Sequence, residues 1–413
     1  MAGSRLSTLE VGFLVCLLAG LFIRIVGAFY FVHDNDFPVF WEAAERAYKE
    51  PLSIYHSMGR DDYPQPYTYF PSYAFVLSPF AFLANALALN ENWKFFLGHI
   101  PVYLGDVGVC ILLYRMLKDK GRIAQLLGVS LYWLSPVVLN GGVHIAHFES
   151  LVVFFLLLAI MYKNRPIACG LFLGISASFK IYGFFLLPVF LFQLNEVKKI
   201  RTIFDIKELF NRNSAKLLIA FSIVPLVTII PYLLTDANRT LSCLVGHHAT
   251  RPADYYTWLG WLGYYSNPFT AANVFLLDYN VHLVFYMCTF AAYWTRRLPI
   301  EHALVFGMLA FLFTNKFIYP QYLVVIVPLL ILAGSNFEIV KEQNAFEKFF
   351  CKYKVTSKPA LFYLFISVMV IFPGQWDIVR VLILGTFLSL ISFLWFSYEF
   401  LSIHLTKLRM NEA

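Results

Sequence analysis

The chain has 413 residues, of which 59% are hydrophobic and only 14% are charged. About a quarter of the residues of a typical soluble domain are charged, so this composition excludes a soluble protein and indicates one that resides in a membrane. The net charge of +7 does not indicate a nucleic-acid partner, because the basic residues lie in short clusters between apolar blocks.

Apolar blocks suited to crossing a bilayer follow one another along the chain. They lie near residues 11–32, 69–89, 95–117, 123–142, 149–162, 166–181, 183–194, 217–235, 271–294, 301–313, 320–333, 359–373 and 378–402. The first block has no cleavage site after it and is expected to be a retained span. The sequence therefore predicts an all-α multi-pass membrane protein, with residues 1–413 forming a single polytopic domain.

The basic clusters decide which blocks cross the membrane. If every block crossed, the clusters at 115–122 and 198–216 would be misplaced, against the rule that basic residues stay on the cytoplasmic side. The block at 69–89 is interrupted by Pro71 and Pro79, and we expect it to lie along the outer surface or to re-enter it. If this block is not counted as a span, about 12 spans remain and both termini are cytoplasmic.

This topology places the polar segments with chemical potential outside. The expected outer segments are a first loop at 33–93, a second at 236–270 and a short hairpin at 315–322, whereas 195–216 and 334–358 form basic cytoplasmic loops. An active site is therefore expected on the lumenal or extracytoplasmic face.

The strongest local feature is the run His33-Asp34-Asn35-Asp36 directly after the first span. Such a run is common at helix caps and turns. However, residues 37–49 that follow have the apolar spacing of an amphipathic helix suited to a membrane surface. That helix would hold Asp34 and Asp36 at the outer interface, where a partly desolvated carboxylate can act as a general base.

A second group combines His144, His147 and Glu149. Histidines at this spacing are a weak zinc signal without a third ligand, so no metal is predicted. They either cap a span at the interface or contact substrate, and substrate contact is favoured over metal binding. Outer cations are the third feature: Lys180, Arg251 and Lys316 either extend to the headgroups or bind a phosphate attached to a lipid.

Asp106 lies in the middle of a span. A carboxylate there is either a structural hydrogen-bonding centre, with Arg24 of the first span as a candidate partner, or part of a polar path.

In order along the chain, these motifs resemble the GT-C glycosyltransferases that use dolichyl- or polyprenyl-phosphate sugars, most of all GPI mannosyltransferase I and the polyprenol-phosphate-mannose mannosyltransferases. The matching segments are Asp34–Ala44, Ser53–Tyr55, Tyr67–Pro71, Gly105–Asp106, Leu112–Arg115, Tyr132–Pro136, Phe179–Tyr182, Leu186–Pro188, Thr250–Arg251, Asn315–Lys316 and Gln321–Tyr322. The segment 144–150 is instead more similar to the HxHF motif of the lumenal glucosyltransferases, which leaves mannose and glucose open as the donor sugar.

The resemblance implies a GT-C-like helical bundle with surface helices in the first outer loop. It implies an inverting hexosyltransferase in which Asp36, aided by Asp34, deprotonates a glycolipid acceptor, with Arg251, Lys316 and Lys180 on the donor phosphate. The residues expected to contact substrate are His144, His147, Glu149, Tyr182, Gln321 and Tyr322. No cofactor is implied. The membrane would be the endoplasmic reticulum or a prokaryotic plasma membrane, and a small membrane subunit is a possible partner.

A different class of protein, a lipid or solute transporter without covalent chemistry, is the alternative. Inverted-repeat transporters often carry polar residues at matching midplane positions in two halves. Asp106 has no counterpart in the second half, which disfavours this alternative.

Overall fold

The computed structural model describes residues 7–59, 65–194, 211–250, 299–315 and 319–335, with residues 289, 292, 363, 366 and 367. Nearly all of them are helical. The chain divides into a first compact unit of residues 1–183, 216–247 and 320–371 and a second of 184–215, 248–319 and 372–413. The predicted blocks at 271–294, 359–373 and 378–402 lie almost entirely outside the described residues.

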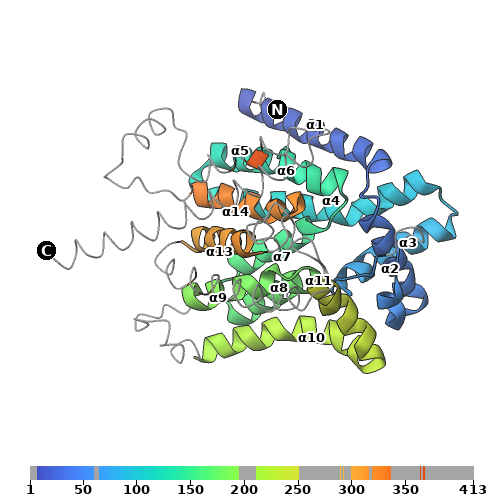
Figure 1. Cartoon of the computed structure of the whole chain (residues 1–413). Helices are drawn as coiled ribbons and strands as arrows, with labels where there is room; N and C mark the ends of the chain where they lie inside the picture. Colours follow the sequence, from blue (N-terminus) through green and yellow to red (C-terminus); the bar gives the residue numbers. More distant parts are fainter. Residues whose placement is uncertain are drawn as a thin grey trace, which may run out of the picture. The chain divides into compact units, whose positions relative to one another are not determined.

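The helices follow the predicted blocks closely. In chain order they are α1 (Thr8–Tyr30), α2 (Asp36–Lys49), η1 (Pro51–His56), α3 (Ser72–Ala86), α4 (Glu91–Met116), η2 (Lys118–Lys120), α5 (Arg122–Trp133), α6 (Pro136–Leu139), η3 (Asn140–His144), α7 (Glu149–Met161), α8 (Pro166–Phe179), α9 (Tyr182–Leu194), α10 (Arg212–Leu241), η5 (Ser242–Gly246), α11 (His247–Thr250), α13 (Ile300–Thr314), η7 (Pro320–Tyr322) and α14 (Leu323–Ser335). Within the first unit, α1, α4, α5 and α7 pack as neighbours (Figure 1).

Four of the described helical stretches are long and apolar enough to cross a membrane, namely Thr8–Tyr30, Glu91–Met116, Arg122–His144 and Arg212–Gly246. The outward side chains of the first are apolar: Val15 is 59% exposed and Phe22 is 67% exposed. Apolar side chains left uncovered by protein along a whole helix are suited to contact with lipid. The prediction of an all-α multi-pass membrane protein is therefore confirmed. That α3 lies along the outer surface remains a prediction.

A buried ion pair joins the helices of the first unit. Arg24 of α1 donates from Nε and Nη2 to Oδ2 of Asp106 in α4, at 3.0 and 2.9 Å, and both side chains are almost fully buried. The other oxygen of Asp106 accepts hydrogen bonds from Tyr132 of α5 at 2.9 Å and Ser150 of α7 at 2.6 Å. The structure thus confirms Arg24 as the partner of Asp106 and gives Asp106 the structural role.

Trp133 fixes α5 against α1. Its indole Nε1 donates to the carbonyl of Leu17 at 3.0 Å, and the guanidinium of Arg24 lies 3.6 Å from the centre of its ring. A methyl group at Gly20 would collide with this ring, so the close approach requires a glycine there.

The amphipathic helix predicted after Asp36 is present as α2, but its apolar face packs against protein. Phe37 contacts Phe95 of α4 with ring centres 5.3 Å apart, and Phe40 contacts Tyr73 of α3 at 5.4 Å. These contacts bury the face that the sequence alone assigned to the membrane surface. α2 is therefore anchored to the bundle, which fixes Asp36 relative to the other helices.

In the second unit, α9 packs against α13. The rings of Phe185 and Phe311 lie 5.4 Å apart, and Gly307 faces Leu186 and Val189.

Arg24→Met should destabilise the protein by about 3–5 kcal/mol, because it leaves the carboxylate of Asp106 buried without a compensating charge. The double variant Arg24→Met with Asp106→Asn should recover most of that loss, since no charge then remains. Thermal unfolding in detergent would measure both. A single variant as stable as the wild type would contradict the assigned role of the pair.

Candidate functional site

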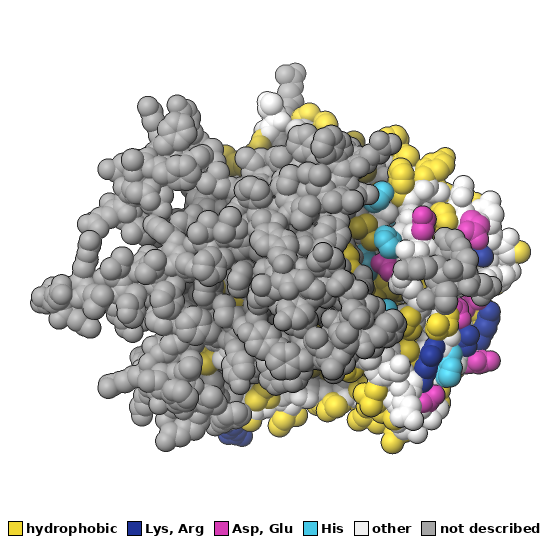
Figure 2. All heavy atoms as spheres, in the orientation of Figure 1, with side chains coloured by type: hydrophobic (Ala, Val, Ile, Leu, Met, Phe, Trp, Pro, Cys, Tyr) yellow, Lys and Arg dark blue, Asp and Glu magenta, His cyan; other side chains and the backbone are white. Residues whose placement is uncertain are grey.

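The candidate site lies at the end of the first unit that carries α2. Figure 2 shows acidic, basic and histidine side chains among the described residues at the right of the view. Asp36 is the first residue of α2, and its side chain is 26% exposed. Its backbone N–H donates to Nδ1 of His33 at 3.2 Å. The carboxylate of Asp34, by contrast, is exposed.

A buried histidine, His147, lies near the carboxylate of Asp36 and pairs with a buried glutamate, Glu149. Nδ1 of His147 lies 2.6 Å from Oε2 of Glu149, and neither side chain is accessible to solvent. An ionised glutamate only accepts hydrogen bonds, so Nδ1 carries a proton, and in a neutral imidazole Nε2 is then the acceptor. Ala146 adopts a positive φ of 57° in the turn that leads into His147, a conformation that costs a residue with a side chain about 1–2 kcal/mol.

Lys180 completes the buried cluster. It follows the last residue of α8 and pairs with the second oxygen of Glu149. Its ammonium lies among the rings of four aromatic side chains, which are Tyr322 at 4.8 Å, Tyr182 at 5.5 Å, Tyr69 at 5.6 Å and Phe148 at 5.7 Å. Such a desolvated cation gains from the negative faces of the rings as well as from the carboxylate.

His147 connects this cluster to Asp36. Its Nε2 lies 3.9 Å from Oδ2 of Asp36 and 3.4 Å from the hydroxyl of Tyr69. The first distance is too long for a hydrogen bond and is short enough for one to form after a small shift or through one water. Residues from α2, the start of α7 and the junction of α8 with α9 therefore converge on one point.

The segment before α3 is held by two buried tyrosines. Tyr55 donates to the carbonyl of Tyr69 at 3.0 Å, and Tyr67 donates to the carbonyl of Phe70 at 2.9 Å. Burial raises the pKa of each hydroxyl well above its ordinary value, so both remain protonated donors. These bonds set the position of Tyr69 against His147.

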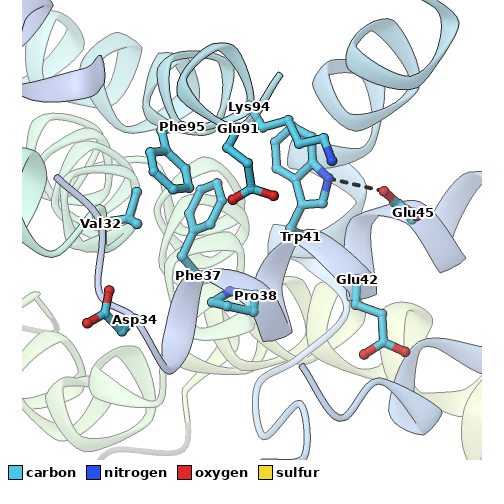
Figure 3. A pocket seen from close by; sticks show the side chains of 10 residues that line it. All are labelled: Val32, Asp34, Phe37, Pro38, Trp41, Glu42, Glu45, Glu91, Lys94 and Phe95. Atoms are coloured by element: carbon cyan, nitrogen blue, oxygen red, sulfur yellow. Dashed lines mark hydrogen bonds between the residues drawn. The ribbon is translucent and has the colours of Figure 1, made fainter. Parts of the chain in front are cut away.

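A pocket of about 480 Å³ opens on the side of α2 where Asp34 lies, between that helix and the start of α4. Phe37, Trp41 and Phe95 contribute apolar surface, and Glu91 and Lys94 of α4 reach it from the opposite side (Figure 3). Two other acidic side chains of the lining have partners: Glu42 accepts from Arg46 at 3.0 Å, and Glu45 accepts from the indole of Trp41 at 3.1 Å. Asp34 lines this pocket, whereas Asp36 lies near His147. The two carboxylates are therefore in different surroundings, although they are close in sequence.

The other residues predicted for the site differ in their burial and in their neighbours. His144 is exposed and lies beside Phe31, 5.8 Å between ring centres, whereas His147 is buried. Tyr182 and Tyr322 face each other at 5.9 Å beside Lys180, and Gln321 is almost fully buried. Arg251 and Lys316 lie outside the described residues. Within the described part of the chain, no group of three His, Cys, Asp or Glu side chains could hold a metal ion.

Sequence reasoning did not find the roles of Tyr69, Phe148 and Trp41. Tyr69 lies in the matching segment Tyr67–Pro71, but this segment carries no signal for a cation-binding ring. Phe148 lies in the segment 144–150 that is similar to the HxHF motif, and this likeness did not indicate its contact with Lys180.

No protein-family model matches the sequence, and a search of curated proteins finds no match. Among solved structures, the chain is similar to ArnT from Cupriavidus metallidurans in the apo state, with 14% identity, a TM-score of 0.50, and coverage of 93% of this chain and 77% of that one. The structure of ArnT from the same organism bound to undecaprenyl phosphate has 14% identity and a TM-score of 0.46, over 92% of this chain and 77% of that one. The likeness to apo ArnT concerns the fold alone, and it agrees with the all-α membrane fold that the sequence predicts.

Proposed function

We propose that this protein is an inverting glycosyltransferase that moves a sugar from a dolichyl or polyprenyl phosphate to a glycolipid acceptor on the extracytoplasmic side of its membrane. The observation that carries the proposal is the position of Asp36. In a GT-C-like fold, it begins a helix anchored to the bundle and faces His147, which is backed by Glu149 and Lys180. This arrangement is suited to a general base whose position is supported by neighbouring side chains.

The reaction needs one base and one stabilised leaving group. Asp36 removes the proton of an acceptor hydroxyl while the hydroxyl oxygen forms a bond to the anomeric carbon. The bond from that carbon to the phosphate oxygen breaks, and the lipid phosphate leaves with the electron pair. Because attack and departure occur on opposite faces of the sugar, the anomeric configuration inverts.

Cations would stabilise the departing phosphate. Arg251 and Lys316 keep this proposed role as predictions. For Lys180, the ion pair with Glu149 favours a role in holding that carboxylate over direct contact with phosphate, since its charge is already compensated.

The acceptor would enter through the pocket beside α2. Asp34 lines this pocket and carries an exposed carboxylate, which suits a hydrogen bond to a sugar hydroxyl. Aromatic surfaces such as those of Phe37 and Phe95 provide an apolar wall for a sugar ring. Asp34 thus binds the acceptor, and Asp36 acts as the base.

Mannose is the proposed donor sugar, on the motif likeness to GPI mannosyltransferase I. Glucose is the second candidate, because the segment around His147 is more similar to the glucosyltransferases. The membrane would be the endoplasmic reticulum or a prokaryotic plasma membrane, and a small partner subunit is compatible with either.

Asp36→Asn should lower sugar transfer about 100-fold or more, because the amide cannot accept the hydroxyl proton. Membranes carrying wild type or variant would be given radiolabelled dolichyl- or polyprenyl-phosphate mannose, then the glucose donor, and label in glycolipid would be counted at equal protein level. A variant as active as wild type would reject Asp36 as the base.

Asp34→Asn should mainly raise the KM for the acceptor and lower kcat much less, because a residue that binds the acceptor equally in the ground and transition states affects KM. Acceptor titration at saturating donor would separate the two constants. An effect confined to kcat would instead place Asp34 in the chemistry.

A further inference from the structure

A carboxylate such as that of Asp36 is a weak base for the removal of a hydroxyl proton. A free carboxylate binds a proton more weakly than a free imidazole by about two to three pKa units. A hydroxyl proton delivered to Asp36 alone would therefore be held weakly, and return of the proton would compete with product formation. A stronger proton acceptor within reach of Asp36 would remove this competition.

His147 meets the geometric requirements for that acceptor. The hydrogen bond from Nδ1–H to Glu149 fixes the tautomer and directs the unprotonated Nε2 towards the site. This nitrogen lies 3.9 Å from the nearer carboxylate oxygen of Asp36. The imidazole is inaccessible to solvent and packs on Phe148, with ring centres 4.8 Å apart.

Charged and polar groups surround His147. Glu149 would lie directly against the imidazolium, and Lys180 compensates Glu149 from the other side. The further groups that face the imidazole or Asp36 are the hydroxyl of Tyr69 at 3.4 Å from Nε2 and His33, whose Nδ1 is 3.3 Å from the carboxylate of Asp36. With Lys180 balancing Glu149, the negative charge of Asp36 is balanced by His147 once it is protonated.

We propose that His147 is the second proton carrier of this site, taking from Asp36 the proton that leaves the acceptor hydroxyl. The proton passes from the hydroxyl oxygen to Oδ2 of Asp36 and then to Nε2 of His147, which becomes an imidazolium stabilised by Glu149. Asp36 is returned to its ionised form, and after the product has left, the proton passes from His147 back through the partly exposed Asp36 to water. Glu149 and Lys180 are positioning residues for His147. The proposal rests on the transfer reaction proposed above.

Chemical rescue tests this role. His147→Gly should lower sugar transfer about 100-fold, because the proton acceptor is lost. Added imidazole should restore much of the activity by entering the space left by the side chain. With a series of substituted imidazoles of similar size, the restored rate should increase with the basicity of the added compound. A purely structural role of His147 would show no such dependence.

The His147→Gln variant has a side chain of similar volume. Its rate of sugar transfer should fall by a similar factor, and added imidazole should not restore it, since no space is opened. His56→Gly is the matched control: this exposed histidine lies at the end of η1, and its variant should retain wild-type activity and ignore imidazole. A double variant Asp36→Asn with His147→Gln should be no less active than Asp36→Asn alone, because both changes interrupt one proton path.

The outcomes separate the two proposals. Wild type that transfers no sugar from either donor overturns the proposed function and the relay with it. If wild type is active and His147→Gln matches it, the relay alone is overturned. A rescue that is independent of basicity, or losses that multiply in the double variant, would likewise overturn the relay and leave Asp36 as the base.

Discussion

The buried ion pair between Arg24 and Asp106 is the interaction on which the rest of the first unit depends. An isolated charge inside a membrane protein is costly, so each partner requires the other. Asp106 uses one oxygen for Arg24 and the other for Tyr132 and Ser150. Four helices are thereby tied to one carboxylate, and α7 is fixed at its second residue.

The attachment of α7 to Asp106 also positions the candidate site, because Ser150 is the neighbour of Glu149. With α7 held by Asp106, Glu149 stands at a defined point where His147 and Lys180 reach it from different elements. Aromatic rings around Lys180 lower the local polarity and strengthen these charge interactions. The positive φ of Ala146 is a local cost of turning His147 inwards, and such strain is typical of functional segments.

A fold similar to that of ArnT does not by itself define chemistry, since function depends on the site. Here the site adds three features to the fold. Asp36 lies at a partly exposed edge, a histidine stands behind it, and an aromatic pocket opens beside Asp34. The proposed transfer reaction would use all three.

The sequence by itself determined the class of protein, most span positions and the acidic run before α2, because bilayer thickness and helical periodicity act locally along the chain. It also named Arg24 as a candidate partner of Asp106, since a charge within a span demands one. Only the tertiary structure decided that the apolar face of α2 packs on protein, that His147 turns inwards while His144 stays exposed, and that Lys180 pairs with Glu149. These outcomes depend on which surfaces meet between elements distant in sequence, and an apolar or charged residue looks the same in sequence whatever partner covers it.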